Sequence, residues 1–423
     1  TTLLNQYMNS LKKNKLIDIF IFLIVLIFII NFFGIYISNY YFDDGDYRDS
    51  FGFLFKPDDR PPVSLNSSIG NHYFGDISEL AYLSKLDDPY NNENYEQSYP
   101  PLLIFIFKNI VKTGQDVLIV NAAIHILSLI LIYFASLQYS NNSTLTNSFF
   151  LFFVLCSKFF FYSIDRGNIE FLVIGILFFS VFYKLSTTKR IGLLALAVSL
   201  KPSVLIFIPL FGFNVLLLTV VLAAILYIAF FALLKEPIFE SSLNMIEAFS
   251  KTQFPTLHNW QLLDQDLSIW GKLYWARHTD SIVNTSLGNF LQGIYNNRAT
   301  IFYLLLFFIW TLYFLKQLEP GIHFWILIGI TSCLFFSFSG VYKSAILIIP
   351  LFYLFTSSQK VENENSYIVL ITFIFLQLPF FRHMNNFDIY NDITVWSFFS
   401  FVVSLILFCI SIKNIIFSKE KNE

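Results

Sequence analysis

The chain has 423 residues, of which 56% are hydrophobic and only 13% are charged, and 53 of them are Phe. A soluble domain cannot cover so much apolar surface, and continuous apolar runs of roughly 20 residues, without the alternation of a β-barrel, predict membrane-spanning helices. The formal net charge of -2 and the lack of a basic patch argue against a nucleic-acid partner. We therefore expect an all-α polytopic membrane protein.

The apolar runs predict about 11 to 12 transmembrane helices. They lie near residues 19–38, 117–138, 147–163, 168–187, 191–212, 213–234, 300–316, 321–339, 343–357, 366–381 and 394–412. Lys12, Lys13 and Lys15 precede the first run, which is too long for the apolar core of a signal peptide and is interpreted as an uncleaved helix. The same lysines place the N-terminus in the cytoplasm under the positive-inside rule.

The run near 191–212 contains Lys201-Pro202, and two interpretations of it give opposite topologies. If the run were one helix, Lys316, Lys360 and the lysines of the C-terminal tail would face outward. If the chain breaks at Lys201-Pro202 and turns back, these lysines lie in the cytoplasm. Because proline ends a helix at the preceding residue, we predict the break, which also brings Lys201 towards the outer face.

Two long polar segments, residues 39–116 and 235–299, then lie outside the membrane within a single transmembrane domain of residues 1–423. The first segment gathers carboxylates, tyrosines and turn-forming residues. Within it, Leu102 to Val111 is too short to span and is expected to lie along the interface or to lead into the next helix. The links on the other side are short, so we expect the polar chemistry on the outer face.

Several common catalytic patterns are missing from the sequence. It has no G-x-x-x-x-G-K loop, no G-x-S-x-G elbow and no HExxH zinc pattern, which argues against ATP hydrolysis and serine esterase chemistry. Cys156, Cys333 and Cys409 lie inside apolar runs and are interpreted as core residues. No cluster has the ligand spacing of a metal site, and we expect no cofactor.

Carboxylates outside the membrane and cations at membrane depth suit transfer of a group from a lipid-linked anionic donor. In such a reaction a carboxylate takes a proton from an acceptor hydroxyl while Lys or Arg binds the departing phosphate. Lys201 fits the second role, because an ionisable group at membrane depth is costly and such residues are usually functional. The alternative is a structural role, in which the Lys201 side chain only extends to the membrane interface. For Arg166 the alternative is an ion pair with Asp165.

A set of short motifs resembles the GT-C glycosyltransferases of family 87, the polyprenyl-phosphate-mannose-dependent mannosyltransferases. The matching motifs occur in the order of that family: Asp76, Pro89-Tyr90, Tyr99-Pro100-Pro101-Leu102, Arg166-Gly167-Asn168, Ser199-Leu200-Lys201-Pro202 and Asn284-Thr285-Ser286-Leu287. The sequence departs from the family pattern in three ways, of which the first is about thirty residues inserted between the first helix and Asp76. Ile77 stands where an aromatic residue is usual, and Tyr342-Lys343 stands where the family often has a histidine-containing turn.

The resemblance implies a GT-C fold and an inverting transfer from a polyprenyl phosphate sugar, with Asp76 as the general base. GT-C enzymes more broadly place an acidic pair just after the first helix, so Asp44, with its neighbours Asp43 and Asp46, is the alternative base. The residues expected to bind donor or acceptor are Lys201, Arg166, Asn168, Tyr99, Asn284, Lys343 and His258.

The sequence therefore predicts a hexosyltransferase in the cytoplasmic (inner) membrane of a bacterium, with its active site on the periplasmic or exterior side. The expected acceptor is a cell-envelope glycan or glycolipid, for example an O-antigen or capsule unit. One alternative is a glycan polymerase that joins diphosphate-linked repeat units. Another is a transporter or flippase for lipid-linked sugars, since broken helices are common in transporters. The expected partners are the donor, the acceptor and membrane lipid.

Overall fold

The structure is a computed structural model of the chain. It describes residues 75–91, 98–139, 167–253, 285–316, 322–334, 345–356 and 395–417, with short pieces between residues 150 and 164. These described residues form helices and no strands, which confirms the all-α expectation for this part of the chain. The predicted spans near 19–38 and 366–381 lie outside the described residues.

Among the described residues, two helices are long and apolar enough to cross a membrane. They are α5 (Gly114–Tyr139) and α10 (Phe213–Leu234), and they fit the predicted spans near 117–138 and 213–234. A third span is possible by length if α13 (Ser286–Asn296) and α14 (Arg298–Lys316), which meet at a bend of 61°, are taken together. The chain is therefore a helical membrane protein.

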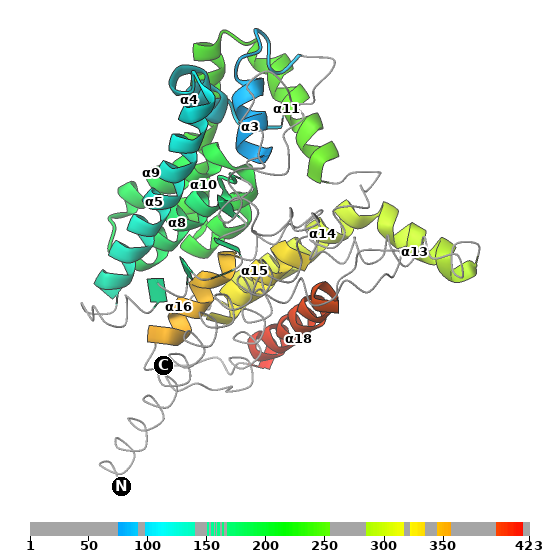
Figure 1. The fold of residues 1–423 in the computed structure, drawn as a ribbon. Helices are drawn as coiled ribbons and strands as arrows, with labels where there is room; N and C mark the ends of the chain where they lie inside the picture. The colour runs from blue at the N-terminus through cyan, green and yellow to red at the C-terminus, as the bar shows by residue number, and fades with distance from the viewer. Residues whose placement is uncertain are drawn as a thin grey trace, which may run out of the picture.

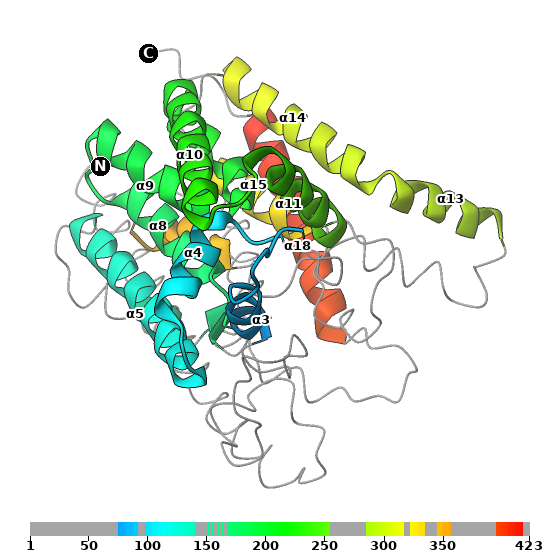
Figure 2. The same ribbon diagram turned by 90° about the horizontal axis from the view of Figure 1, so that it is seen from above.

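The remaining described helices are shorter. They are α3 (Gly75–Leu83), α4 (Pro101–Ile110), α8 (Glu170–Phe182), α9 (Thr187–Leu200), the 3₁₀-helix η3 (Pro202–Phe211), α11 (Ile238–Gln253), α15 (Ile322–Leu334), α16 (Ile348–Thr356) and α18 (Val395–Phe417). Helices α3, α4 and α11 lie at the upper end of Figure 1, and α15, α16 and α18 lie in its lower half. Helix α13 extends beyond the other helices in Figures 1 and 2.

The predicted break at Lys201-Pro202 is confirmed. Helix α9 ends at Leu200, Lys201 has an extended backbone, and the ring of Pro202 starts η3. The chain then turns back, because the guanidinium carbon of Arg190, near the start of α9, lies 5.9 Å from the centre of the Phe211 ring at the end of η3. Helix α9 and η3 therefore form a hairpin with Lys201 at its tip, and α10 starts beside the first residues of α9.

The core is packed tightly around α8. A Cβ atom added to Gly175 of α8 would lie 3.1 Å from the Cα atom of Ser128 on α5, so these two helices approach closely through small residues. Nearer the C-terminal end of α8, the ring of Phe352 from α16 lies 5.1 Å from Phe178 and 4.8 Å from Phe182. These contacts connect the N-terminal helices to the C-terminal ones.

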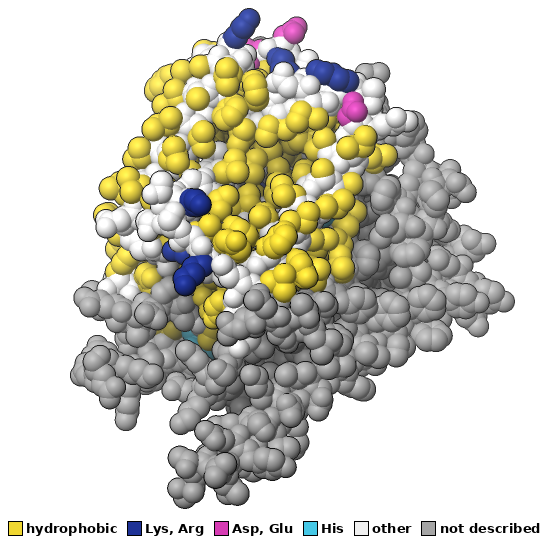
Figure 3. All heavy atoms as spheres, turned by 90° about the vertical axis from the view of Figure 1, so that its left-hand side faces the viewer, with side chains coloured by type: hydrophobic (Ala, Val, Ile, Leu, Met, Phe, Trp, Pro, Cys, Tyr) yellow, Lys and Arg dark blue, Asp and Glu magenta, His cyan; other side chains and the backbone are white. Residues whose placement is uncertain are grey.

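An apolar surface covers the helices on the left of Figure 1. Figure 3 shows that hydrophobic side chains dominate this face, while Lys, Arg, Asp and Glu gather at its upper edge and a further group of Lys and Arg lies lower. On α10, Leu217, Ile225 and Ile228 are exposed by 53%, 55% and 52%. Such a contiguous apolar surface suits contact with lipid acyl chains.

Candidate functional site

Asp76 lies in the first turn of α3, where the partial positive charge of the helix N-terminus favours a carboxylate. Its Oδ2 atom accepts a hydrogen bond of 2.6 Å from Nδ2 of Asn168. Oδ1 of Asn168 in turn accepts a hydrogen bond of 2.8 Å from the backbone N–H of Glu170, at the start of α8. The buried Asn168 side chain therefore joins the N-termini of α3 and α8 and fixes the direction of the Asp76 carboxylate.

A glycine makes this arrangement possible. Gly167 has a φ of +66°, a conformation that costs energy for any residue with a Cβ atom. A Cβ atom at this position would also lie only 2.3 Å from Cγ2 of Ile77, the residue that follows Asp76. The Gly167-Asn168 pair thus lets the turn before α8 contact α3 directly. Arg166 lies outside the described residues.

Two polar residues of α5 support the same turn from the membrane side. Nδ2 of Asn121 donates a hydrogen bond of 3.0 Å to the carbonyl of Ile164. Buried His125 lies with Nε2 3.0 Å from Oγ of Ser163, and Ser163 is 3.1 Å from the carbonyl of Asn168. The sequence analysis missed this pair, although two polar residues at i and i+4 inside an apolar run were a usable signal.

Tyr99 contacts the backbone of the candidate base. Its hydroxyl donates a hydrogen bond of 3.2 Å to the carbonyl of Asp76, and its own carbonyl accepts one of 2.9 Å from the hydroxyl of Tyr90. The Tyr99 ring therefore holds the start of α3 against the segment before α4. In this arrangement Tyr99 positions Asp76 through its main chain.

Lys201 is paired with a residue that the sequence analysis did not single out. Its Nζ atom lies 2.5 Å from Oε2 of Glu170, and the side chains are 21% and 14% exposed. Because Glu170 also donates its backbone N–H to Asn168, a continuous line of contacts runs from Asp76 through Asn168 and Glu170 to Lys201. The structure thus brings Asp76, Asn168, Tyr99 and Lys201 into one cluster.

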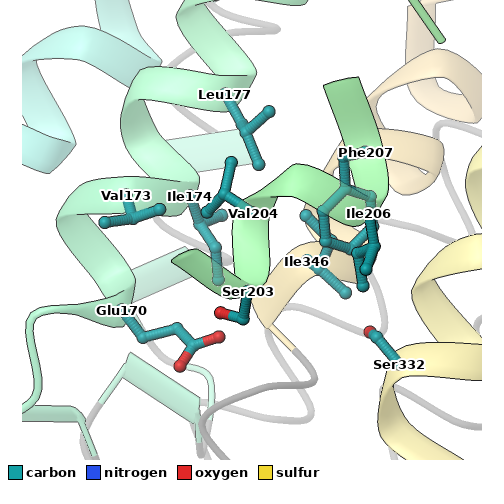
Figure 4. Close-up of a pocket in the computed structure, with 10 residues that line it drawn as sticks. All are labelled: Glu170, Val173, Ile174, Leu177, Ser203, Val204, Ile206, Phe207, Ser332 and Ile346. Atoms are coloured by element: carbon teal, nitrogen blue, oxygen red, sulfur yellow. The ribbon is translucent and has the colours of Figure 1, made fainter. Parts of the chain in front are cut away.

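A mostly apolar pocket lies beside this cluster. It is small and opens to the surface; its empty space, counting the open mouth, is about 400 Å³. Its walls come from α8, η3, α15 and the segment before α16, and its lining residues are Glu170, Val173, Ile174, Leu177, Ser203, Val204, Ile206, Phe207, Ser332 and Ile346. Glu170 and Ser203 lie together at one end, with Val173, Ile174, Val204 and Leu177 beyond them (Figure 4).

A second polar cluster holds the loop after α3 against α11. Nδ2 of Asn244 lies 3.2 Å from the carbonyl of Tyr90 and 2.5 Å from Oδ1 of Asn91. Nearby Glu236, only 8% exposed, accepts a hydrogen bond of 3.2 Å from Ser241. Burial, aided by the negative charge of Asp88, raises the pKa of Glu236 to about 7.

Several candidate residues lie outside the described residues. They are Asp44 with its neighbours Asp43 and Asp46, Arg166, Asn284, Lys343 and His258. Thr285, which follows Asn284, caps α13, because its Oγ1 atom accepts a hydrogen bond of 3.1 Å from the N–H of Gly288. Within the described ranges, no group of three or more His, Cys, Asp and Glu side chains could hold a metal ion.

Fold and site together define a helical membrane protein that brings a carboxylate and an ammonium group into one cluster beside an apolar pocket. No protein-family model, curated protein or solved structure matches the chain.

Proposed function

We propose that the chain is a GT-C type glycosyltransferase of the bacterial inner membrane. It moves a hexose from a polyprenyl-phosphate-linked donor to a hydroxyl of a cell-envelope glycan or glycolipid on the outer side. The observation that carries this proposal is the line of contacts from Asp76 through Asn168 and Glu170 to Lys201. It puts a carboxylate and an ammonium group within one cluster, and transfer from a sugar phosphate ester would use the first as general base and the second to bind phosphate.

In the proposed reaction, Asp76 takes the proton of the acceptor hydroxyl as its oxygen attacks the anomeric carbon of the donor. The bond between that carbon and the phosphate oxygen breaks, the configuration inverts, and the polyprenyl phosphate leaves with the bonding electrons. Lys201 exchanges its contact with Glu170 for the departing phosphate and stabilises the negative charge. Asn168 keeps the Asp76 carboxylate in position, because a fixed base avoids reorientation during the reaction.

The apolar pocket supports a lipid-linked donor over a soluble one. Glu170, the partner of Lys201, lies at the end of the pocket, and Val173, Ile174, Leu177 and Val204 form its wall. A phosphate at Lys201 would therefore have its first isoprenoid units next to apolar side chains. A water-soluble nucleotide sugar would bring polar groups to the same surface, which is unfavourable.

The test is a transfer assay with the full-length protein in nanodiscs and a radiolabelled polyprenyl phosphate hexose. Asp76→Asn keeps the size of the side chain and its contact with Asn168, so we expect a folded protein whose transfer rate falls by about 10² to 10⁴-fold. The matched control is Asp87→Asn, at an exposed aspartate on the loop after α3. Normal activity of Asp76→Asn refutes its role as base, and no transfer by the wild type from any monophosphate donor refutes the proposed function.

One observation favours a transporter as the second candidate. The α9–η3 hairpin is a broken membrane segment with an ionisable residue at its tip, an arrangement found at transport sites. A flippase would move a labelled lipid-linked sugar across a proteoliposome membrane without forming a new glycolipid. Formation of a labelled product in the same vesicles excludes this candidate as the main activity.

A further inference from the structure

Helix α13 has one apolar and one polar side and no charged residue. Leu287, Phe290, Leu291 and Ile294 follow the i, i+3, i+4, i+7 spacing of one helix face. Leu287 and Phe290 are exposed by 52% and 63%, so this face is largely open. The opposite side carries Asn289, Gln292 and Asn296, and Nε2 of Gln292 donates a hydrogen bond of 2.6 Å to Oδ1 of Asn296 along it.

Helix α14, which follows α13 directly, also has exposed apolar side chains. On α14, Tyr303, Leu304 and Phe307 are exposed by 58%, 62% and 71%, as expected for side chains that face lipid. The two helices meet at a bend of 61°, so they cannot both run along the membrane normal. A helix that leaves a spanning direction at this angle and has one apolar side suits the membrane–water interface.

The bend itself is held by a buried arginine. Arg298, the first residue of α14, is 6% exposed, and its Nη1 atom donates a hydrogen bond of 3.0 Å to the carbonyl of Tyr295. Its guanidinium carbon also lies 4.4 Å from the centre of the Tyr295 ring. At the other end, Thr285 caps the helix. The cap at Thr285 fixes where α13 starts, and the contacts of Arg298 fix where α13 ends and how it meets α14.

We propose that α13 lies in the membrane–water interface, with Leu287, Phe290 and Ile294 among the acyl chains and Asn289 and Asn296 in the headgroup layer. The leaflet is the one where α10 ends, because residues 235–285 contain no apolar run of roughly 20 residues that could cross the membrane. Since α13 has no charge, its insertion rests on apolar burial and is insensitive to anionic lipid and to salt. This placement is independent of the proposed transfer reaction.

Lipid fits this surface better than a second copy of the chain does. Helix α13 is followed directly by α14, whose exposed apolar side chains suit lipid, and α13 extends beyond the other described helices (Figure 2). Leu291 and Ile294 are partly covered, so the open apolar side chains of α13 are Leu287 and Phe290, far fewer than the roughly 20 to 30 residues a side of a standard protein interface. A lipid bilayer has no such minimum contact area, because lipid covers the exposed side chains of α13 and α14 together.

The experiment is a nitroxide scan of residues 286–296, one cysteine at a time, in the full-length protein with Cys156, Cys333 and Cys409 replaced by serine, in phosphatidylcholine nanodiscs. The ratio of collision with oxygen to collision with a soluble nickel chelate should rise at Leu287, Phe290 and Ile294 and fall at Asn289 and Asn296, with a period of about 3.6 residues. Leu304 on α14 serves as the lipid reference. Adding anionic lipid or salt should leave the pattern unchanged.

High nickel accessibility at every position would overturn the proposal, as would spin–spin broadening between copies at Phe290. If the cysteine-free protein does not fold, the wild type is photolabelled with a phosphatidylcholine that carries a diazirine on its acyl chain. Adducts on Leu287, Phe290 or Ile294 support the proposal. Adducts on α14 with none on α13 overturn it.

Discussion

Replacing Gly167 by alanine tests the contact between the turn before α8 and α3. The substitution has two separate costs. The φ of +66° is unfavourable for a residue with a Cβ atom by about 1 to 2 kcal/mol, and the new atom would lie 2.3 Å from Cγ2 of Ile77. Ile77 is 1% exposed and cannot move into solvent, so we add about 1 to 3 kcal/mol for overpacking. The expected total is about 2 to 5 kcal/mol.

Two other glycines separate these costs. Gly212 has φ +99° and ψ 157°, a conformation almost exclusive to glycine, and no described neighbour lies within 4 Å of an added Cβ atom, so Gly212→Ala carries a backbone cost of about 1 to 3 kcal/mol and no steric cost. Gly192, in the middle of α9, has neither problem, and Gly192→Ala should be neutral or stabilising by about 0.5 to 1 kcal/mol. In an Ile77→Ala background, which carries its own cavity cost, Gly167→Ala should keep only the backbone part of its cost.

The assay is thermal unfolding of the full-length variants in one detergent, with transfer activity measured in parallel. The order of melting temperatures should be Gly192→Ala highest, then Gly212→Ala, then Gly167→Ala. Because the turn carries Asn168, Gly167→Ala should also move the partner of Asp76 and reduce transfer. If Gly167→Ala costs as much stability in the Ile77→Ala background as in the wild type, the close approach of this turn to Ile77 is refuted.

Three further predictions concern polar groups. The costs of Lys201→Met and Glu170→Gln in free energy of unfolding should add up to about 1 to 3 kcal/mol more than the cost of the double variant. Thermal unfolding of the wild type, both single variants and the double variant measures this coupling. Simple additivity would argue against the ion pair. Folding raises the pKa of Glu236 from its ordinary value of 4.5 to about 7. The contribution of Glu236 to the free energy of unfolding is therefore fully present below pH 4.5 and is lost as the pH rises through about 7. The wild type should therefore lose up to about 3 kcal/mol between about pH 5 and pH 8, whereas Glu236→Gln should lose less; equal slopes would contradict this. His125→Leu removes the partner of Ser163 and should lower stability by about 1 to 3 kcal/mol, and an unchanged melting temperature would show that Asn121 alone holds the turn.

The sequence predicted the features that depend on local composition. Helix α10 has the predicted bounds because no charged residue, proline or glycine lies between Gly212 and Lys235. The break at Lys201 follows from the ring of Pro202, which has no N–H to continue α9. Helix α8 is shorter than the predicted 168–187, because the chain is extended at Tyr183 and the next helix starts after Ser186.

The contacts between distant segments could not be predicted in the same way. From the sequence, Glu170 is a carboxylate in the first turn of a helix. Only the packing of α8 against the α9–η3 hairpin brings it to Lys201. The closeness of Gly167 to Ile77 likewise depends on how α3 sits on the turn. Periodicity identifies faces of helices, but it carries no information on which faces meet. The pairing of the site residues therefore had to come from the three-dimensional arrangement.

The close approach of α5 and α8 at Ser128 and Gly175 determines how a membrane-dissolved ligand could enter. With the two backbones nearly in contact, an acyl or isoprenoid chain has no room to pass between these helices and meets them as a continuous wall. The pocket beside Glu170 is bounded on its other sides by η3 and α15. For the proposed lipid-linked donor, this contact excludes the gap between α5 and α8 as a route to the pocket.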